Sequence, residues 1–304
     1  MSHDKLIQDA SVPVSEQTTR QSALYDRVSE QTASMIIREY STSFGLAARL
    51  LGKDVRQDVE NIYGLVRLAD EIVDGVAAYA GINEKEIRRL LDELEAETEA
   101  AMLRGYSTNL VVHAFALTAR RTGIPVELTR PFFESMRVDI TRVTHTPESF
   151  DLYVYGSAEV VGLMCLRAFL RGVPVTAEQD ARFVHGARKL GAAFQKVNFL
   201  RDLSADVDAL GRSYFPGINI ATFTEDDKMR LVADIDADLA VSAAIVPELP
   251  RTSRKAVALA QNLFAELNRR IERTPASELK HTRVSVPTIV KARLALAALM
   301  GKTS

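Results

Sequence analysis

Two stretches of this chain place aspartates four residues apart, a spacing at which a helix brings both carboxylates to one face. In the first stretch, the polar members of that face are Tyr63, Arg67, Asp70 and Asp74. In the second stretch they are Gln195, Asn198, Asp202 and Asp206. At about 100° per residue, each set falls within one arc of a helix, and apolar residues lie on the opposite side. Each stretch therefore predicts a helix that is polar where a core-facing helix is normally apolar.

The spacing of these carboxylates has an electrostatic cost. Aspartates four apart repel each other by a few tenths of a kcal/mol in water, and more strongly when they are shielded from it. Magnesium is the natural cation to offset this repulsion, because it prefers carboxylate oxygens and is commonly completed by substrate phosphates. Two such helices across a cavity would hold several magnesium ions and stabilise a diphosphate as a leaving group. Arg67 and Arg201 would add charge-assisted contacts to the same oxygens.

The alternative interpretation is a solvated helix face, which is the commoner explanation of any single pair of aspartates at this spacing. Both stripes here combine aspartate with tyrosine, arginine, glutamine and asparagine rather than with lysine and glutamate. Two such helices in one chain favour a metal and diphosphate site over two solvated surfaces.

Composition restricts the class of protein. Hydrophobic residues make up 47% and charged residues 26% of the 304 residues, which is sufficient for a large core. The formal net charge of -2 provides no general basic field, so no nucleic-acid partner is expected. The single cysteine, Cys165, cannot form an intramolecular disulfide, which fits a reducing cytoplasm. No window reaches the ~18 apolar residues of a membrane span, although peripheral membrane contact for product release remains compatible with the sequence.

Apolar periodicity predicts an all-α protein. We expect residues 1–19 to form a polar, partly disordered tail and residues 20–304 to form one helical domain. The expected helices cover residues 20–51, 54–79, 83–104, 107–121, 129–143, 148–171, 177–209, 225–246, 252–273 and 286–300. Most prolines fall between these segments, where proline starts or stops helices.

The motifs that contain the two stripes resemble those of the squalene/phytoene synthase family, the head-to-head isoprenyl diphosphate synthases. RLADEIVDG at 67–75 is similar to the first aspartate-rich motif of that family, and NFLRDLSADVDALGRSYFP at 198–216 to the second. YSTSF at 40–44 is similar to its early motif near the diphosphates, and YVYGSAEVVG at 153–162 to its central helix. The resemblance extends from about Tyr40 to Arg293.

This resemblance implies an isoprenoid synthase helical bundle around a central cavity. It implies joining of two identical allylic diphosphates to a cyclopropyl intermediate, which ionises and rearranges to a linear hydrocarbon, with magnesium, or manganese in its place. The implied metal ligands are Asp70, Asp74, Asn198, Asp202 and Asp206. The implied diphosphate contacts are Ser41, Ser43, Arg67, Arg201, Arg212 and Tyr214. Tyr63, Tyr153 and Gln195 are implied to lie near the reacting carbons.

Carbocation chemistry also requires aromatic faces and few nucleophiles. Tyr63, Tyr153 and Phe44 would supply such faces. In the central helix, the small or apolar residues Gly156, Ser157, Val160 and Gly162 would form one wall of a lipid slot, with close helix packing as the alternative. Glu159 departs from the family pattern, and if it points inward it requires a partner, for which an arginine would serve. Phe264 stands where related enzymes often have tyrosine, and it is left out of the site.

The sequence says less about the substrate than about the type of reaction. The motifs GRSYFP and RVSVP favour a bacterial phytoene synthase acting on geranylgeranyl diphosphate, with NADPH not expected. A squalene or dehydrosqualene synthase acting on farnesyl diphosphate is the alternative, because slot depth cannot be read from the sequence. A non-catalytic assembly or binding protein, and a terpene cyclase acting on one substrate, are further alternatives. Both a monomer and a homodimer are compatible with the sequence.

Overall fold

The computed structural model describes residues 16–141, 144–203 and 214–300. These residues form helices joined by short loops, with no β-strand among them, so the all-α prediction is confirmed. The expected tail of residues 1–19 falls largely outside the described residues, and the first helix begins at Glu16.

The first half of the chain contributes seven helices as far as Thr141. They are α1 (Glu16–Tyr40), α2 (Ser43–Ala48), α3 (Lys53–Val73), α4 (Val76–Tyr79), α5 (Glu84–Arg104), α6 (Leu110–Thr122) and α7 (Val126–Thr141). Asparagine side chains cap α5 and α6 at their N-termini, and glycines with positive φ, Gly105 and Gly123, follow their C-termini.

The second half begins with one helix of three parts: α8 (Pro147–Val154), the π-helical turn η1 (Tyr155–Glu159) and α9 (Val160–Leu170). The remaining elements are α10 (Ala177–Arg201), the 3₁₀ turn η2 (Ile220–Thr222), α12 (Glu225–Ile245), the 3₁₀ turn η3 (Val246–Glu248), α13 (Arg251–Arg273), α14 (Ala276–Leu279) and α15 (Thr288–Leu299). Capping boxes begin α8, α10 and α12.

Three helices are shorter than the sequence predicts. The segment 20–51 is interrupted between Tyr40 and Ser43, where the Ser41 hydroxyl accepts a hydrogen bond from the Phe44 amide and so competes with a continuous helix. The segment 54–79 is interrupted after Val73, where Asp74 caps α3, and becomes helical again in α4 from Val76. In the segment 177–209, the helix α10 ends at Arg201, with Asp202 as its cap. The breaks therefore fall beside predicted site residues.

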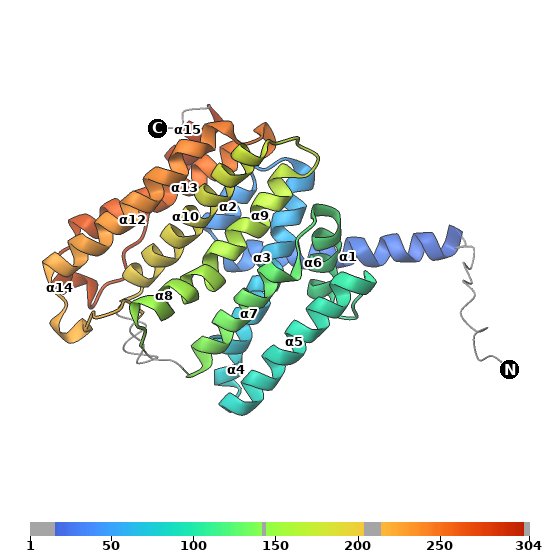
Figure 1. Cartoon of the computed structure of the whole chain (residues 1–304), viewed down its shortest axis with the longest axis horizontal. Coiled ribbons are helices and arrows are strands. Elements are labelled where there is room, and N and C mark those ends of the chain that lie inside the picture. Colours follow the sequence, from blue (N-terminus) through green and yellow to red (C-terminus); the bar gives the residue numbers. More distant parts are fainter. Residues whose placement is uncertain (1–15, 142–143, 204–213, 301–304) are drawn as a thin grey trace.

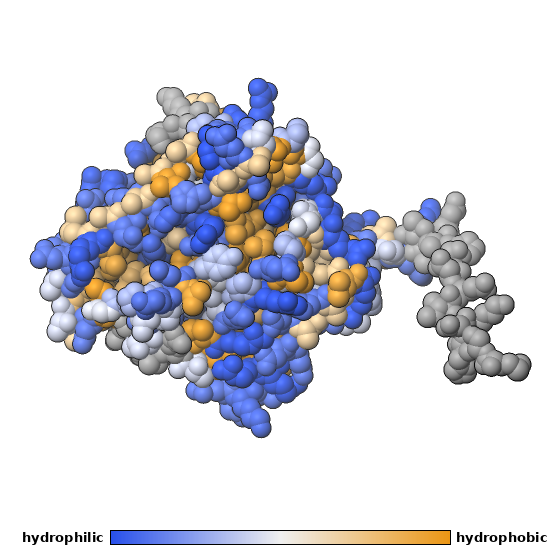
Figure 2. All heavy atoms as spheres, viewed as in Figure 1, coloured by the Kyte–Doolittle hydropathy of each residue, from blue (hydrophilic) through white to orange (hydrophobic). Residues whose placement is uncertain are grey.

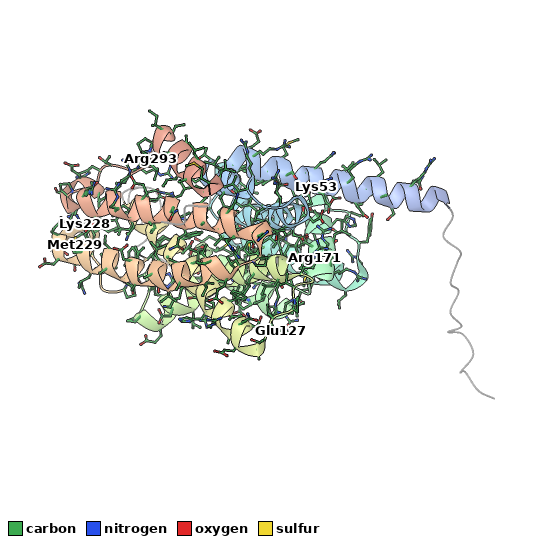
Figure 3. All side chains as sticks on the ribbon, turned by 90° about the horizontal axis from the view of Figure 1, so that it is seen from above. Lys53, Glu127, Arg171, Lys228, Met229 and Arg293 are labelled. Carbon is green, nitrogen blue, oxygen red and sulfur yellow. The ribbon has the colours of Figure 1, made fainter. Side chains whose placement is uncertain are left out.

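The helices pack side by side around α3, α9, α10 and α13 (Figure 1). Buried residues of α3, α5, α6, α7 and α9 form one large hydrophobic cluster, and residues of α8, α10, α12, α13 and α14 form a second. Seen from above, α15 lies outside α13, and Arg293 is labelled on it (Figure 3). The N-terminal part of α1 extends away from the bundle (Figure 1).

Among the described residues, one helix, Pro147–Leu170, is long and apolar enough to cross a membrane by length and composition. It packs against α3, α7 and α10 within the bundle, which accounts for its apolar character. The surface in Figure 2 is mostly hydrophilic, with apolar residues visible in the middle of that face.

Candidate active site

A cavity of about 830 Å³ lies inside the bundle. Its walls come from α2, α3, the η1–α9 segment, α10 and α13, with contributions from the end of α12 and from η3. The predicted site residues that line it are Ser41, Ser43, Phe44, Tyr63, Arg67, Asp70, Ser157, Gly162, Gln195, Asn198, Arg201, Asp202 and Tyr214. Segments far apart in the sequence thus meet around one space.

The polar residues of the two stripes are grouped at one end of this cavity. Arg67 and Asp70 lie near the C-terminus of α3, and Asn198 and Asp202 lie at the C-terminus of α10. The other end is formed by apolar residues, including Leu51, Val246 and Leu249. The space therefore has a charged end and an apolar interior, the form expected for a ligand with a charged head and a long hydrocarbon tail.

On α3, the side chain of Arg67 is held by several neighbours. It donates to Glu71 Oε1, with 3.0 Å from Nε, and its NH1 lies 3.9 Å from Asp70 Oδ2. Its guanidinium also lies over the Tyr40 ring, 4.3 Å from the centroid. Glu71 thus positions Arg67 beside Asp70, a role that the sequence pattern did not indicate.

Asp70 is in surroundings that disfavour its ionised form. Burial raises its pKa to about 7, with Asp74 and Glu71 adding to the rise and Arg67 opposing it. A carboxylate held near other carboxylates gains most from a bound cation, because the cation removes both the repulsion and the cost of burial.

On α10, Asp202 is in contrasting surroundings. It accepts hydrogen bonds from Arg201 and from Arg283, with 2.6 Å between Arg283 Nε and Oδ1. Burial alone would raise the pKa of Asp202, but the two arginines outweigh burial and lower it. Asp202 is therefore ionised, and two guanidinium groups are gathered at the charged end of the cavity.

The loop between α1 and α2 brings the YSTSF motif to the same cavity. Ser41 and Ser43 both line the wall there. Phe44 is stacked on Tyr63, with 6.1 Å between ring centroids, so two of the predicted aromatic faces adjoin. Lys291 on α15 donates to the Thr42 hydroxyl at 3.2 Å and ties this loop to the C-terminal helix.

Tyr153 does not line the cavity directly. It is buried, and its hydroxyl donates to Asp139 on α7, with oxygen distances of 2.7 and 2.9 Å. Burial and the Asp139 carboxylate raise the pKa of Tyr153 well above its usual value. Its ring packs against Tyr214 and Phe199, which line the cavity, so Tyr153 supports the aromatic wall from behind.

The sequence places four residues of the central helix at the slot wall, but the structure brings only two of them there. Ser157 and Gly162 line the cavity. Gly156 instead faces α7, where an added Cβ would lie 2.1 Å from Ser135 Oγ, and Val160 is fully buried in the core cluster. Gly156 and Val160 are four residues apart and so share a face of the helix other than the one that lines the cavity.

The remaining predicted residues lie at the end of α3, on the central helix, or outside the described residues. Asp74 caps α3 and is not among the lining residues, although its charge raises the pKa of both Asp70 and Tyr153. Asp206 and Arg212 lie outside the described residues. Glu159 does have an arginine partner, with Arg188 Nε at 2.5 Å from Oε2.

Sequence reasoning missed several lining residues. Arg283 comes from the loop between α14 and α15, and only its position in RVSVP drew attention to that loop. Phe264 and Phe194 are stacked with 3.8 Å between centroids and form part of the apolar wall. Cys165 also lines the cavity, and burial raises the pKa of its thiol to about 12. Cys165 could have been found from its helical spacing to Ser157 and Val161, whereas the local sequence gives no such signal for Phe194.

Comparison with known proteins identifies a family and a shared fold. Residues 37–289 match the model of the family described as squalene/phytoene synthase. A 15-cis-phytoene synthase from Paracoccus sp. (strain N81106 / MBIC 01143) is 31% identical over 61% of this chain and 59% of the relative. A phytoene synthase from Mycobacterium bovis is 28% identical over 87% of this chain and 88% of the relative.

A solved dehydrosqualene synthase has the same fold, with a TM-score of 0.75 at 22% identity over 91% of this chain and 98% of that one. The family match covers the cavity walls contributed by α2, α3, α9, α10 and α13. This chain belongs to the squalene/phytoene synthase family.

Proposed function

We propose that the protein joins two molecules of geranylgeranyl diphosphate head to head, through a cyclopropyl diphosphate, and releases phytoene. The observation that carries this proposal is one cavity with carboxylates, an asparagine and arginines at one end and apolar walls over the rest of its length. The names of the curated relatives support the choice of product, since both are phytoene synthases.

Magnesium fits the donor set at the charged end. Asp70, Asn198 and Asp202 offer carboxylate and amide oxygens and no thiolate or imidazole, which is the chemistry that magnesium prefers. Within residues 16–141, 144–203 and 214–300 no three His, Cys, Asp or Glu side chains form a metal cluster. We therefore propose a metal held partly by protein and partly by diphosphate, with Asp74 and Asp206 as further ligands. When bound, the metal would neutralise the diphosphate and make it a better leaving group.

The protein's own side chains would bind the diphosphate and exclude water. Arg67 and Arg201 are held by carboxylates at the charged end, and Ser41, Ser43 and Tyr214 line the same cavity. Together with Arg212, these groups would fix the leaving oxygens. Gln195 and the stacked rings of Tyr63 and Phe44 line the cavity and would face the carbon atoms that become cationic.

A second candidate function is condensation of farnesyl diphosphate to squalene or dehydrosqualene. This candidate is supported by the fold that the chain shares with a dehydrosqualene synthase. The walls of the interior include several residues with small side chains, namely Ala48, Gly186, Ala187, Ala256 and Ala260, and this supports the longer substrate. NADPH is not expected to take part.

The test is product identification. Purified protein with magnesium is incubated separately with geranylgeranyl and farnesyl diphosphate, each with and without NADPH, and the hydrocarbons are identified by mass. Phytoene from geranylgeranyl diphosphate, independent of NADPH and abolished by a metal chelator, is the expected result. Squalene made only with NADPH would overturn the phytoene assignment, and no hydrocarbon from either substrate would leave a binding role as the better account. Assays with and without lipid vesicles test membrane contact for product release by a cytoplasmic enzyme.

A further inference from the structure

The outward side of the C-terminal helix α15 is apolar. Four large side chains there are between 51% and 83% exposed, and they are Ile289, Leu296, Leu299 and, at the C-cap, Met300. At about 100° per residue they fall within one arc of about 100°, and these four residues form the α15 face. The opposite side of the helix, at Ala298, is buried against Ala260 and its neighbours on α13. A surface helix normally shows the reverse polarity, with its polar side toward solvent.

The charged residues that flank the α15 face on its own helix and on the start of α13 are all basic. Arg293 lies one turn from both Ile289 and Leu296 and is exposed. Lys255 of α13 reaches the other end of the face, where its Nζ donates to the Leu299 carbonyl at 2.8 Å. Residues 249–265 and 279–304 include no Asp or Glu, although the whole chain has a net charge of -2. The protein thus presents an apolar strip with cationic neighbours to solvent.

An anionic lipid bilayer fits this strip better than a protein does. The strip is the convex side of a single helix, so a protein partner would need a complementary groove, whereas a fluid bilayer accommodates such a helix in the plane of its interface. A second copy of the chain, related by a two-fold axis, would bring the two Arg293 side chains close together, and their repulsion disfavours that contact. Anionic headgroups would instead attract Arg293 and Lys255.

We propose that the α15 face binds the surface of anionic lipid bilayers. Ile289, Leu296 and Met300 insert among the lipids, and Arg293 and Lys255 lie at the headgroups. The binding is peripheral and reversible, because a few side chains of one helix bury far less apolar surface than a membrane-spanning helix does.

The α15 face lies close to the cavity. Helix α15 packs against α2 and α13, and both of these helices contribute to the cavity wall. On its inner side, Lys291 contacts Thr42, which lines the cavity between Ser41 and Ser43. A hydrocarbon made by the proposed function would therefore be released near lipid, although the binding itself does not depend on that reaction.

Sedimentation of the full-length protein with vesicles tests this proposal without any substrate. The protein should bind vesicles of phosphatidylcholine with about one third phosphatidylglycerol, and at least about tenfold more weakly vesicles of phosphatidylcholine alone. The double variant Ile289→Ser, Leu296→Ser should bind the anionic vesicles at least about tenfold more weakly. Its melting temperature should not change, because both side chains are exposed.

The matched control is the double variant Leu103→Ser, Leu152→Ser. These leucines are 80% and 72% exposed, and they belong to α5 and α8, away from α15 (Figure 1). The control should bind anionic vesicles as the unmodified protein does. Equal loss of binding in both double variants, or no binding by the unmodified protein, would overturn the proposal.

A fluorescent residue shows directly whether the α15 face enters the bilayer. The chain has no tryptophan, so Leu296→Trp introduces a single reporter at the centre of the face. Its emission should shift to shorter wavelength when anionic vesicles are added, and that of Leu103→Trp should not. A shift of Leu296→Trp that appears without lipid as the protein concentration rises would assign the face to a second copy and contradict bilayer binding. Because no readout uses substrate, failure of this proposal is distinguishable from failure of the proposed function.

Discussion

Asp70 and Asp202 lie at the same end of the cavity, yet their neighbours affect them in opposite ways. Asp70 is near Asp74 and Glu71 and has Arg67 as its cationic neighbour, whereas Asp202 accepts hydrogen bonds from two arginines. At Asp70 a bound cation would therefore relieve repulsion between carboxylates. Asp202 already holds guanidinium groups at the position proposed for a diphosphate.

Asp202→Asn is expected to abolish most turnover while the protein stays folded. The substitution removes a proposed metal ligand and the acceptor that gathers Arg201 and Arg283, so the rate of hydrocarbon formation should fall by at least about 100-fold. Asp226→Asn, on the exposed surface of α12, is the control and should keep full activity. Undiminished turnover in Asp202→Asn with an unchanged melting temperature would refute the metal role.

Magnesium binding should depend on pH through Asp70. The pKa of this group is about 7 in the metal-free protein, so a proton competes with the cation below that pH. Lowering the pH from about 8 to about 6 should weaken magnesium binding by up to about tenfold, with protons released on binding, measurable by calorimetry in buffers of different ionisation enthalpy. Asp70→Asn should lack most of this dependence. Equal dependence in that variant would assign the proton to another group.

The same shift affects the stability of the metal-free protein. Because the pKa of Asp70 in the folded protein lies above the usual aspartate value of 3.8, ionisation of Asp70 opposes folding. The protonated Asp70 carboxyl contributes stability that is fully present below the pKa of Asp70 in the unfolded chain. This stability is lost as the pH rises through about 7. Magnesium should therefore stabilise the protein most at neutral and alkaline pH.

At the scale of elements, local periodicity predicts most helices, because burial of one face is encoded at helical spacing. It does not predict the helix ends at Tyr40, Val73 and Arg201, the first of which falls beside the hydrogen bond from the Phe44 amide to the Ser41 hydroxyl. Nor does it predict the π-turn, since the pattern of YVYGSAEVVG is compatible with a regular helix. Ser157 and Gly162 line the cavity, whereas Gly156 faces α7 and Val160 lies in the core, so helical spacing alone does not tell which face of the central helix meets the cavity.

Gly156→Ala should destabilise the protein. The added carbon would lie 2.1 Å from Ser135 Oγ and 2.2 Å from the Pro131 carbonyl, so α7 and the π-turn must move apart. Overpacking of this kind costs about 1–3 kcal/mol and should lower the melting temperature by several degrees. Gly45→Ala is the control, because its added carbon meets nothing closer than 3.3 Å. A melting temperature equal to that of the control would contradict the described packing.

At the scale of the whole molecule, the site is formed by segments that are far apart in the sequence. The spacing of residues along the chain does not predict that these segments meet. The two stripes are recognisable because Tyr63, Arg67 and Asp70 recur at helical spacing on α3, as Gln195 and Asn198 do on α10. Arg283 is not, because it reaches Asp202 from 81 residues further along the chain and has no periodic partner. The apolar interior is also built from distant segments, since Phe194 lies on α10, Phe264 on α13 and Leu249 between η3 and α13.

The central claim is that the charged end of this cavity binds metal and diphosphate while its interior holds two prenyl chains. A crystal structure with manganese and an unreactive thio analogue of geranylgeranyl diphosphate tests this claim most directly. Anomalous density for the metal should lie between α3 and the C-terminus of α10, in contact with Asp70 and Asp202, with both prenyl chains inside the cavity. Metal density away from these two residues, or prenyl chains outside the cavity, would contradict the account.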